Sequence, residues 1–138
     1  MKINFIPTSL TFSIFNLFIL VSNCSAQSIA AGGYHNHYIC IDGSVQAWGY
    51  NHNGQLGDGT LTDRWTPVQI NALTGIRGVM GRQYFSLALK NDSTVWALGS
   101  NSAGELGDSS FTNKNTPVKV KGIKGVTRYS LFSFSENL

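Results

Sequence analysis

The stretch Trp48-Gly49-Tyr50-Asn51-His52-Asn53-Gly54-Gln55-Leu56-Gly57-Asp58 has a second version further along the chain, Leu98-Gly99-Ser100-Asn101-Ser102-Ala103-Gly104-Glu105-Leu106-Gly107-Asp108. Measured from Gly49 to Gly99, the period is 50 residues. The same register pairs Tyr34 with Tyr84, and it extends to a Thr-Pro-Val string at residues 66–68 and 116–118. A fixed period of this length predicts a repeat architecture in which each repeat is one supersecondary unit.

Each unit reads as short strands separated by turns, because its apolar runs last only a few residues before Gly, Asn or Asp interrupts them. In the first unit, strands at 38–41 and 45–48 flank Asp42-Gly43-Ser44, a turn sequence typical of β-hairpins. The second unit repeats this hairpin at 86–89 and 95–98. Third strands are expected at 66–70 and 116–120, and a strand at 75–79 is expected to complete the first unit. The sequence therefore predicts an all-β fold, a partial β-propeller of about two four-stranded blades.

The repeat resembles that of the regulator-of-chromosome-condensation propeller family. The resemblance rests on the string Trp-Gly-x-Asn-x-x-Gly-Gln-Leu-Gly, on Ala31-Gly32-Gly33-Tyr34-His35, and on the Asp42-Gly43 turn. It covers roughly residues 29 to 127. The positions that carry the repeat signature are interpreted as structural; they are Gly49, Asn51, Gly54, Gln55, Leu56 and Gly57 in the first unit and Gly99, Asn101, Gly104, Leu106 and Gly107 in the second.

The chain is divided into a leader at 1–26, a first repeat at 29–78, a second repeat at 79–128 and a degenerate or truncated start of a third repeat at 129–138. The resemblance implies a ring of more blades than two, since propellers of this family close with several. The repeat pattern is lost from about Leu131. We therefore expect either a fragment of a longer propeller or a truncated gene product without a function of its own.

The first 26 residues have the pattern of a secretory signal peptide, with Lys2 ahead of an apolar run and small residues before a cut after Ala26. This predicts a secreted or cell-surface protein with no stable membrane span after processing. Such a cut removes Cys24 and leaves Cys40 as an unpaired, buried cysteine, so no internal disulfide is expected. Lipidation of Cys24 is the alternative, because Val21-Ser22-Asn23-Cys24 loosely resembles a lipobox.

The titratable residues do not suggest an enzyme. Repeat-equivalent Asp residues sit in turns, where their side chains are expected to bond main-chain amides two residues on. His35 and His37 point to the same side of a strand and could be zinc ligands, but the second repeat has Phe85 and Leu87 there, so no metal site and no cofactor are predicted. A carbohydrate-active propeller remains as the enzyme alternative.

The formal net charge of +3 is modest, and the basic residues near the C-terminus are interpreted as a solvated edge, with no nucleic-acid partner expected; they are Lys114, Lys119, Lys121, Lys124 and Arg128. Trp48 and Trp96 are assigned to the core between blades.

Tyr50, His52 and Trp65 lie in or beside loops and are the candidate partner-contact residues. The sequence thus favours a secreted, non-catalytic module that binds an unknown protein partner, with homo-oligomerisation possible through exposed blade faces. The resemblance also implies an alternative as a small-GTPase exchange factor or an enzyme inhibitor; export argues against the nuclear exchange role.

Overall fold

The computed structural model describes residues 24–127 and shows two four-stranded antiparallel sheets. The first sheet has the order β1-β2-β3-β4 and the second β5-β6-β7-β8. The strands of the first are Ala26–Ala31, His35–Cys40, Val45–Gly49 and Arg64–Gln69; those of the second are Ile76–Gly81, Phe85–Lys90, Val95–Gly99 and Lys114–Lys119. The predicted fold class, a partial β-propeller of two blades, is confirmed.

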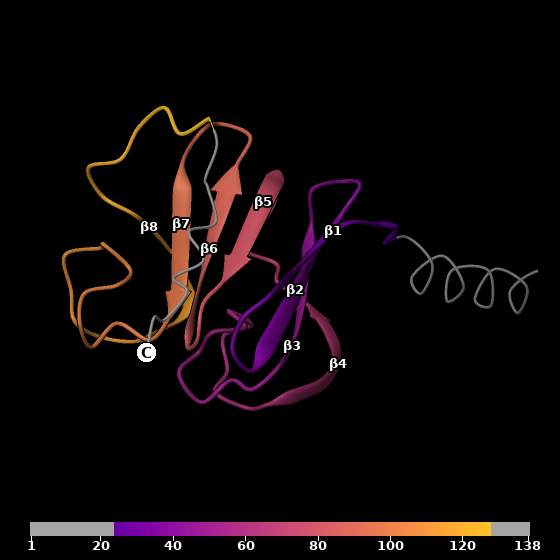
Figure 1. Ribbon diagram of the computed structural model, residues 1–138, viewed down its shortest axis with the longest axis horizontal. Helices are drawn as coiled ribbons and strands as arrows, with labels where there is room; N and C mark the ends of the chain where they lie inside the picture. Colours follow the sequence, from indigo (N-terminus) through magenta and orange to yellow (C-terminus); the bar gives the residue numbers. More distant parts are fainter. Residues whose placement is uncertain (1–23, 128–138) are drawn as a thin grey trace, which may run out of the picture.

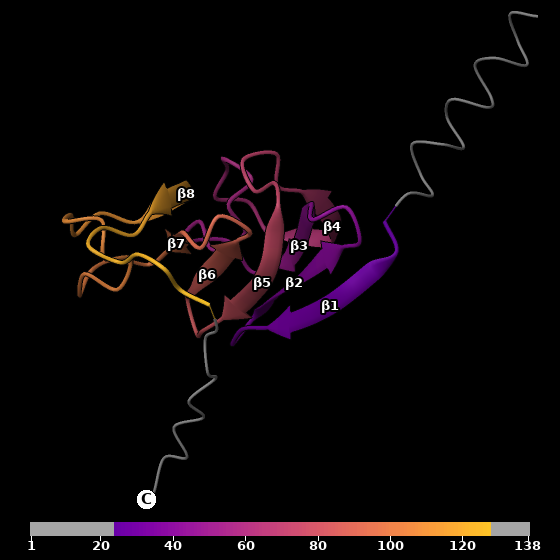
Figure 2. The same ribbon diagram turned by 90° about the horizontal axis from the view of Figure 1, so that it is seen from above.

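The two sheets, called the first and second blade below, lie side by side, with β5 against β1 and β2 (Figures 1 and 2). Their registers repeat each other. Ile29 pairs with Tyr38 and Tyr38 with Gln46 in the first blade, as Val79 pairs with Ala88 and Ala88 with Trp96 in the second. Residues fifty positions apart therefore occupy equivalent places in the two blades.

One strand assignment was wrong. The strand at 76–81 exists, but it is the first strand of the second blade rather than the last strand of the first. The first blade is completed instead by β1, which begins at Ala26, the residue after which the leader was expected to end. The sequence analysis missed β1 because this strand begins among the small residues that also indicate a signal-peptide cut, so its start was assigned to the leader.

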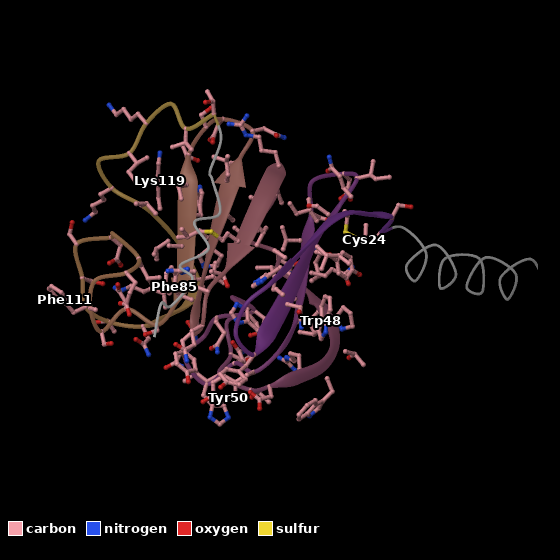
Figure 3. The ribbon with its side chains drawn as sticks, viewed as in Figure 1. Cys24, Trp48, Tyr50, Phe85, Phe111 and Lys119 are labelled. Carbon is pink, nitrogen blue, oxygen red and sulfur yellow. A yellow bond between two sulfur atoms is a disulfide. The ribbon has the colours of Figure 1, made fainter. Side chains whose placement is uncertain are left out.

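The expectation of an unpaired Cys40 was also wrong, since a disulfide joins Cys24 to Cys40 (Figure 3). The bridge fastens the start of β1 to the end of β2, where Ala26 pairs with Cys40 and the Ile41 amide donates to the Ser25 carbonyl at 3.0 Å. A chain cut after Ala26 before it folds would lack Cys24 and could not form this disulfide.

The core lies between the blades. Alternate residues of each strand face the neighbouring blade, as the twofold side-chain period of a strand requires. The cluster draws on both blades: Ile39, Val45, Ala47, Leu56, Ile70 and Leu73 come from the first repeat, and Ile76, Val79, Ala88 and Leu98 from the second. Trp96 packs against it as predicted. Trp48 does not face the other blade, because its strand turns that face outward; its half-buried ring lies 5.7 Å from Tyr38.

Candidate protein-binding surface

The Asn of each repeat signature has its side chain buried and fully used. Asn51 Nδ2 donates to the Thr60 and Thr62 carbonyls, both at 3.1 Å, and to Asp58 Oδ1 at 3.2 Å, while its Oδ1 accepts from the Leu56 amide at 3.0 Å. Asn101 repeats the pattern one period later, with Leu106, Asp108, Ser110 and Thr112. These two asparagines hold the long loop before the last strand of each blade.

The turn acids are structural as well. Each accepts the main-chain amide two residues on at 2.9–3.0 Å, in the pairs Asp42–Ser44, Asp58–Thr60, Asp92–Thr94 and Asp108–Ser110. The Ser110 hydroxyl and amide, opposed by partial desolvation, lower the pKa of Asp108 to about 2. At Asp58 burial raises the pKa, but the Thr60 and Arg64 hydrogen bonds outweigh it and lower the pKa overall. Carboxylates kept ionised in this way hold turns closed.

Three tyrosines gather at one end of the two blades. Tyr34 and Tyr84, which are repeat equivalents, stack across the blade boundary with ring centroids 6.0 Å apart. Tyr50 lies 6.2 Å from Tyr34 and 6.3 Å from Tyr84, so each ring touches the other two (Figure 3 labels Tyr50). Tyr34 is 61% exposed and Tyr84 36%. We call Tyr34, Tyr50 and Tyr84 the tyrosine cluster.

The tyrosine cluster includes only part of the predicted contact set. His52 extends it, because its ring lies 4.5 Å from that of Tyr50, and its Nε2 lies 3.7 Å from Asp63 Oδ1. Trp65 is 87% exposed on β4, and no ring contact joins it to the cluster among the described residues. The sequence analysis paired Tyr34 with Tyr84 as repeat equivalents without identifying them as a site. That pairing was the signal, since Tyr34 and Tyr84 are the repeat equivalents that stack across the blade boundary.

The two histidines tested as zinc ligands face the second blade. His35 Nε2 lies 2.7 Å from Ser86 Oγ, whose hydroxyl also donates to the Gln55 carbonyl at 3.2 Å. Burial lowers the pKa of His35 to about 4 and, with the nearby His35, lowers that of His37 to about 3. The nearby Gln55 main chain partly opposes the lowering of the His37 pKa. Neither ring nitrogen of His37 has a partner with the distance and angle of a hydrogen bond. Among residues 24–127 no group of three metal-ligating side chains gathers.

Two of the basic residues, Lys114 and Lys119, lie at the ends of β8, the edge strand of the second sheet. Lys114 pairs with Asp108 at 3.5 Å, whereas Lys119, Lys121 and Lys124 line a hollow of about 550 Å³ that also contains Asp92. Arg128 lies outside the described residues. Over the part of the chain that is described, no helix has the length and apolar character to span a membrane.

Comparison with known proteins agrees with this geometry. The "Regulator of chromosome condensation (RCC1) repeat" matches at residues 42–89, and a second model of the same repeat matches at 26–55. Residues 26–89 of the chain therefore match RCC1 repeats. The first match starts in the hairpin turn of the first blade and ends in β6, so it spans the boundary between the two blades.

Relatives of this RCC1-repeat chain include the Ultraviolet-B receptor UVR8 of Arabidopsis thaliana, 45% identical over 51 residues, which are 37% of this chain and 12% of the receptor. The Secretion-regulating guanine nucleotide exchange factor of Mus musculus is 40% identical over 48 residues, 35% of this chain and 10% of that protein. Among solved structures, Prp20p of Saccharomyces cerevisiae matches with a TM-score of 0.66 at 18% identity, over 72% of this chain and 26% of Prp20p. The chain thus spans about a tenth of these curated relatives and about a quarter of the solved one.

Proposed function

We propose that the chain is a secreted, non-catalytic module that binds a protein partner through the tyrosine cluster. The supporting observation is the contact of three partly exposed tyrosine rings contributed by both blades. Tyrosines supply a large apolar contact area with a polar hydroxyl and lose little side-chain entropy on binding, which is why they are enriched where proteins meet. The similar protein Prp20p has binding properties to Gsp1p and histones. This supports protein binding as the class of function, not either partner.

The absence of a chemical role is part of the proposal. The turn acids, which an enzyme of this composition would use, are engaged by main-chain amides and have lowered pKa values. A general acid needs a pKa raised toward neutrality. The name of the mouse relative suggests exchange-factor activity as the alternative. This alternative has less support, because the chain spans only 10% of that relative.

Selection from a phage-displayed random peptide library on the immobilised chain tests the binding proposal. Enriched peptides are expected to bind the parent chain and to lose at least about tenfold in affinity on Tyr34→Ser with Tyr84→Ser, since aromatic anchors carry much of an interface's binding energy. The control is Ile41→Ser, because Ile41 is another exposed apolar residue, outside the cluster. Peptides that bind the double variant as well as the parent, or the absence of any enriched peptide, would contradict the proposal.

Export is proposed from the leader-like residues 1–26, and the processing site is its sharpest test. Expression in a secreting host, followed by intact-mass analysis of the medium, tests export and locates the processing site. A product starting at Gln27 would support the cut after Ala26 and would contradict the disulfide between Cys24 and Cys40. A product that retains Cys24 and is two hydrogens lighter than its reduced form supports the disulfide. A chain found only inside the cells would contradict export.

A remnant of a longer propeller is the second proposal, supported by the short span of the chain on its relatives. Translating the downstream DNA in all three frames tests it. Further Trp-Gly-x-Asn-x-x-Gly-Gln-Leu-Gly units there would support a disrupted gene, and their absence would count against one. For the open blade faces, the partner proposed is a second copy of the chain, for the reasons that follow.

A further inference from the structure

The second blade leaves partly uncovered a face that the first blade buries: Leu89, Ala97 and Leu106 stay buried on it, and their neighbours do not. In the first blade, His37 and Val45 have 0% exposure because the second blade lies on them. Their repeat equivalents, Leu87 and Val95, are only half-buried. The same contrast holds for Gly57, which is buried, and Gly107, which is exposed. We call Leu87, Val95 and Gly107 the second-blade open face.

The first blade has the converse face. The side of the second blade that packs on the first contains Val79, Ala88 and Leu98, at 7%, 1% and 1% exposure. Their equivalents are Ile29, which is 70% exposed, and Tyr38 and Trp48, which are half-buried. We call Ile29, Tyr38 and Trp48 the first-blade outer face. Figure 3 labels Trp48 of this face in the first blade and Phe85 of β6 in the second blade, and the two labelled residues lie well apart.

We propose that two copies of this chain associate head to tail, with the first-blade outer face of one copy covering the second-blade open face of the next. The packing between the two blades of a single chain supplies the template. The second-blade open face is the repeat equivalent of the face that the first blade contributes to this packing, and the first-blade outer face is the equivalent of the face that the second blade contributes. The proposal goes beyond the tyrosine-cluster function and does not depend on it. Uncovered apolar faces of repeat units are stabilised by stacking a neighbour on them.

The steric details of the template carry over in part. A Cβ at Gly81 would lie 2.5 Å from the Gly32 amide nitrogen, and the equivalents of these two glycines are Ala31 and Arg82, so the main chains must lie further apart at this point of the contact between copies. Leu98 packs so closely on Gly57 that a Cβ at Gly57 would lie 2.4 Å from Leu98 Cδ1. Gly107 preserves this space on the second-blade open face, and Trp48 stands at the position of Leu98. The larger Trp48 and Tyr38 require some repacking relative to Leu98 and Ala88, and the side chains around Gly107 are exposed enough to accommodate it.

The polar details carry over in part. Between the blades, the Gly59 amide donates to the Asn115 carbonyl at 2.9 Å. Ser109 and Trp65 are the equivalent residues, so the same main-chain bond would run between copies and bring the exposed Trp65 into the contact. Glu105 is an unfavourable polar member, because it stands where the first blade buries Gln55 at 0% exposure. A carboxylate is costly to bury without a counter-charge.

The two faces differ, so the contact is heterologous and adds copies in one direction until it closes into a ring or continues as a filament. This gives a complementation test. Ile29→Asp disables the first-blade outer face and Leu87→Asp disables the second-blade open face, while each variant keeps its other face. The control is Ser102→Asp, because the equivalent His52 stays exposed, with 62% of its side chain accessible, where the blades are packed.

Sedimentation velocity and light scattering on the full chain purified from a secreting host measure the result. Wild type and Ser102→Asp are expected to form oligomers that dissociate on dilution, and each face variant is expected to be monomeric. An equimolar mixture of the two face variants is expected to give a one-to-one dimer and nothing larger. A monomeric wild type, a face variant that still dimerises by itself, or a folded mixture that stays monomeric would overturn the proposal.

Glu105→Gln provides a test that misfolding cannot imitate. This variant is expected to associate more tightly than wild type, whereas an unfolded variant would lose specific association. Restoring the residue that the first blade buries at this place is expected to lower the midpoint concentration of assembly by about tenfold, with the near-ultraviolet circular dichroism of each chain unchanged. A midpoint that stays the same or rises would overturn the assignment of this face.

Discussion

The two blades share a register, a turn network and a loop structure, yet the face with His37 and Val45 is buried in the first blade and its equivalent, with Leu87 and Val95, is only half-buried in the second. Leu73 has no exposed surface and its equivalent Ile123 is 45% exposed; Ile70 is buried and Val120 is only half-buried. The repeat pattern specifies where an apolar residue stands, and the neighbour decides whether it is buried. In repeat proteins, stability is accordingly a sum of terms within a unit and terms between units.

The largest expected effect separates these two terms directly. Leu73→Ala removes a fully buried side chain and is expected to lower the free energy of unfolding by about 2–5 kcal/mol. Ile123→Ala, at the equivalent but exposed place, is expected to cost less than about 1 kcal/mol. Urea denaturation of the two variants, well below the concentration of assembly, measures the difference. Equal losses would contradict the contrast between the blades.

Removal of the disulfide is the next largest effect, and it applies to the first blade alone, since Lys90 stands where the first blade has Cys40. Cys24→Ser with Cys40→Ser is expected to lower the free energy of unfolding by about 3 kcal/mol, because the bridge closes a loop of 16 residues. The reduced parent chain should match the double variant in a thermal melt. A chain whose melting is insensitive to reductant would show that Cys24 and Cys40 are not joined.

The turn asparagines should behave alike, because their bonds lie within each repeat. Asn51→Ala and Asn101→Ala each remove buried hydrogen bonds to carbonyl and carboxylate oxygens and are expected to cost about 2–3 kcal/mol. Similar losses in the same urea experiment would assign this network to the repeat itself. A loss confined to Asn51→Ala would instead make the network depend on the cover of the second blade.

The smallest effect concerns His37. Both of its ring nitrogens are buried without a hydrogen-bond partner, and Leu87 is its equivalent. His37→Leu is therefore expected to stabilise the fold at pH 7 by about 1 kcal/mol, through loss of an unsatisfied polar group.

The variant should also reduce acid sensitivity. The pKa values of His35 and His37, about 4 and about 3 in the folded chain, lie below the ordinary value of 6.5, so the unfolded chain binds more protons below pH 6.5. Stability is complete above about pH 6.5 and falls as the pH drops toward 3. Urea midpoints at several pH values measure this slope, which should be shallower in His37→Leu; an unchanged slope would contradict the assignment.

The sequence predicted the features that lie within one repeat and missed some that arise between repeats. The fold class, the two hairpins and the role of the turn acids followed from Asp-Gly turns, alternation and period. The allocation of the strand at 76–81 to the second blade did not follow, since a strand's partner depends on tertiary packing. The tyrosine cluster was found only in part, because the contact of Tyr34 with Tyr84 exists only once adjacent blades are side by side.

Native-state hydrogen exchange tests the contrast between the blades most directly. Below the concentration of assembly, main-chain amides of β2 and β3 are expected to exchange only through global unfolding, because the second blade buries their face with His37 and Val45. Those of β6 and β7 are expected to open at a lower free energy, because no blade covers their face with Leu87 and Val95. Above that concentration, β6 and β7 should gain protection. Equal protection of the two hairpins in the dilute chain, or faster exchange in β2 and β3, would contradict the contrast between the buried face with His37 and Val45 and the half-buried face with Leu87 and Val95.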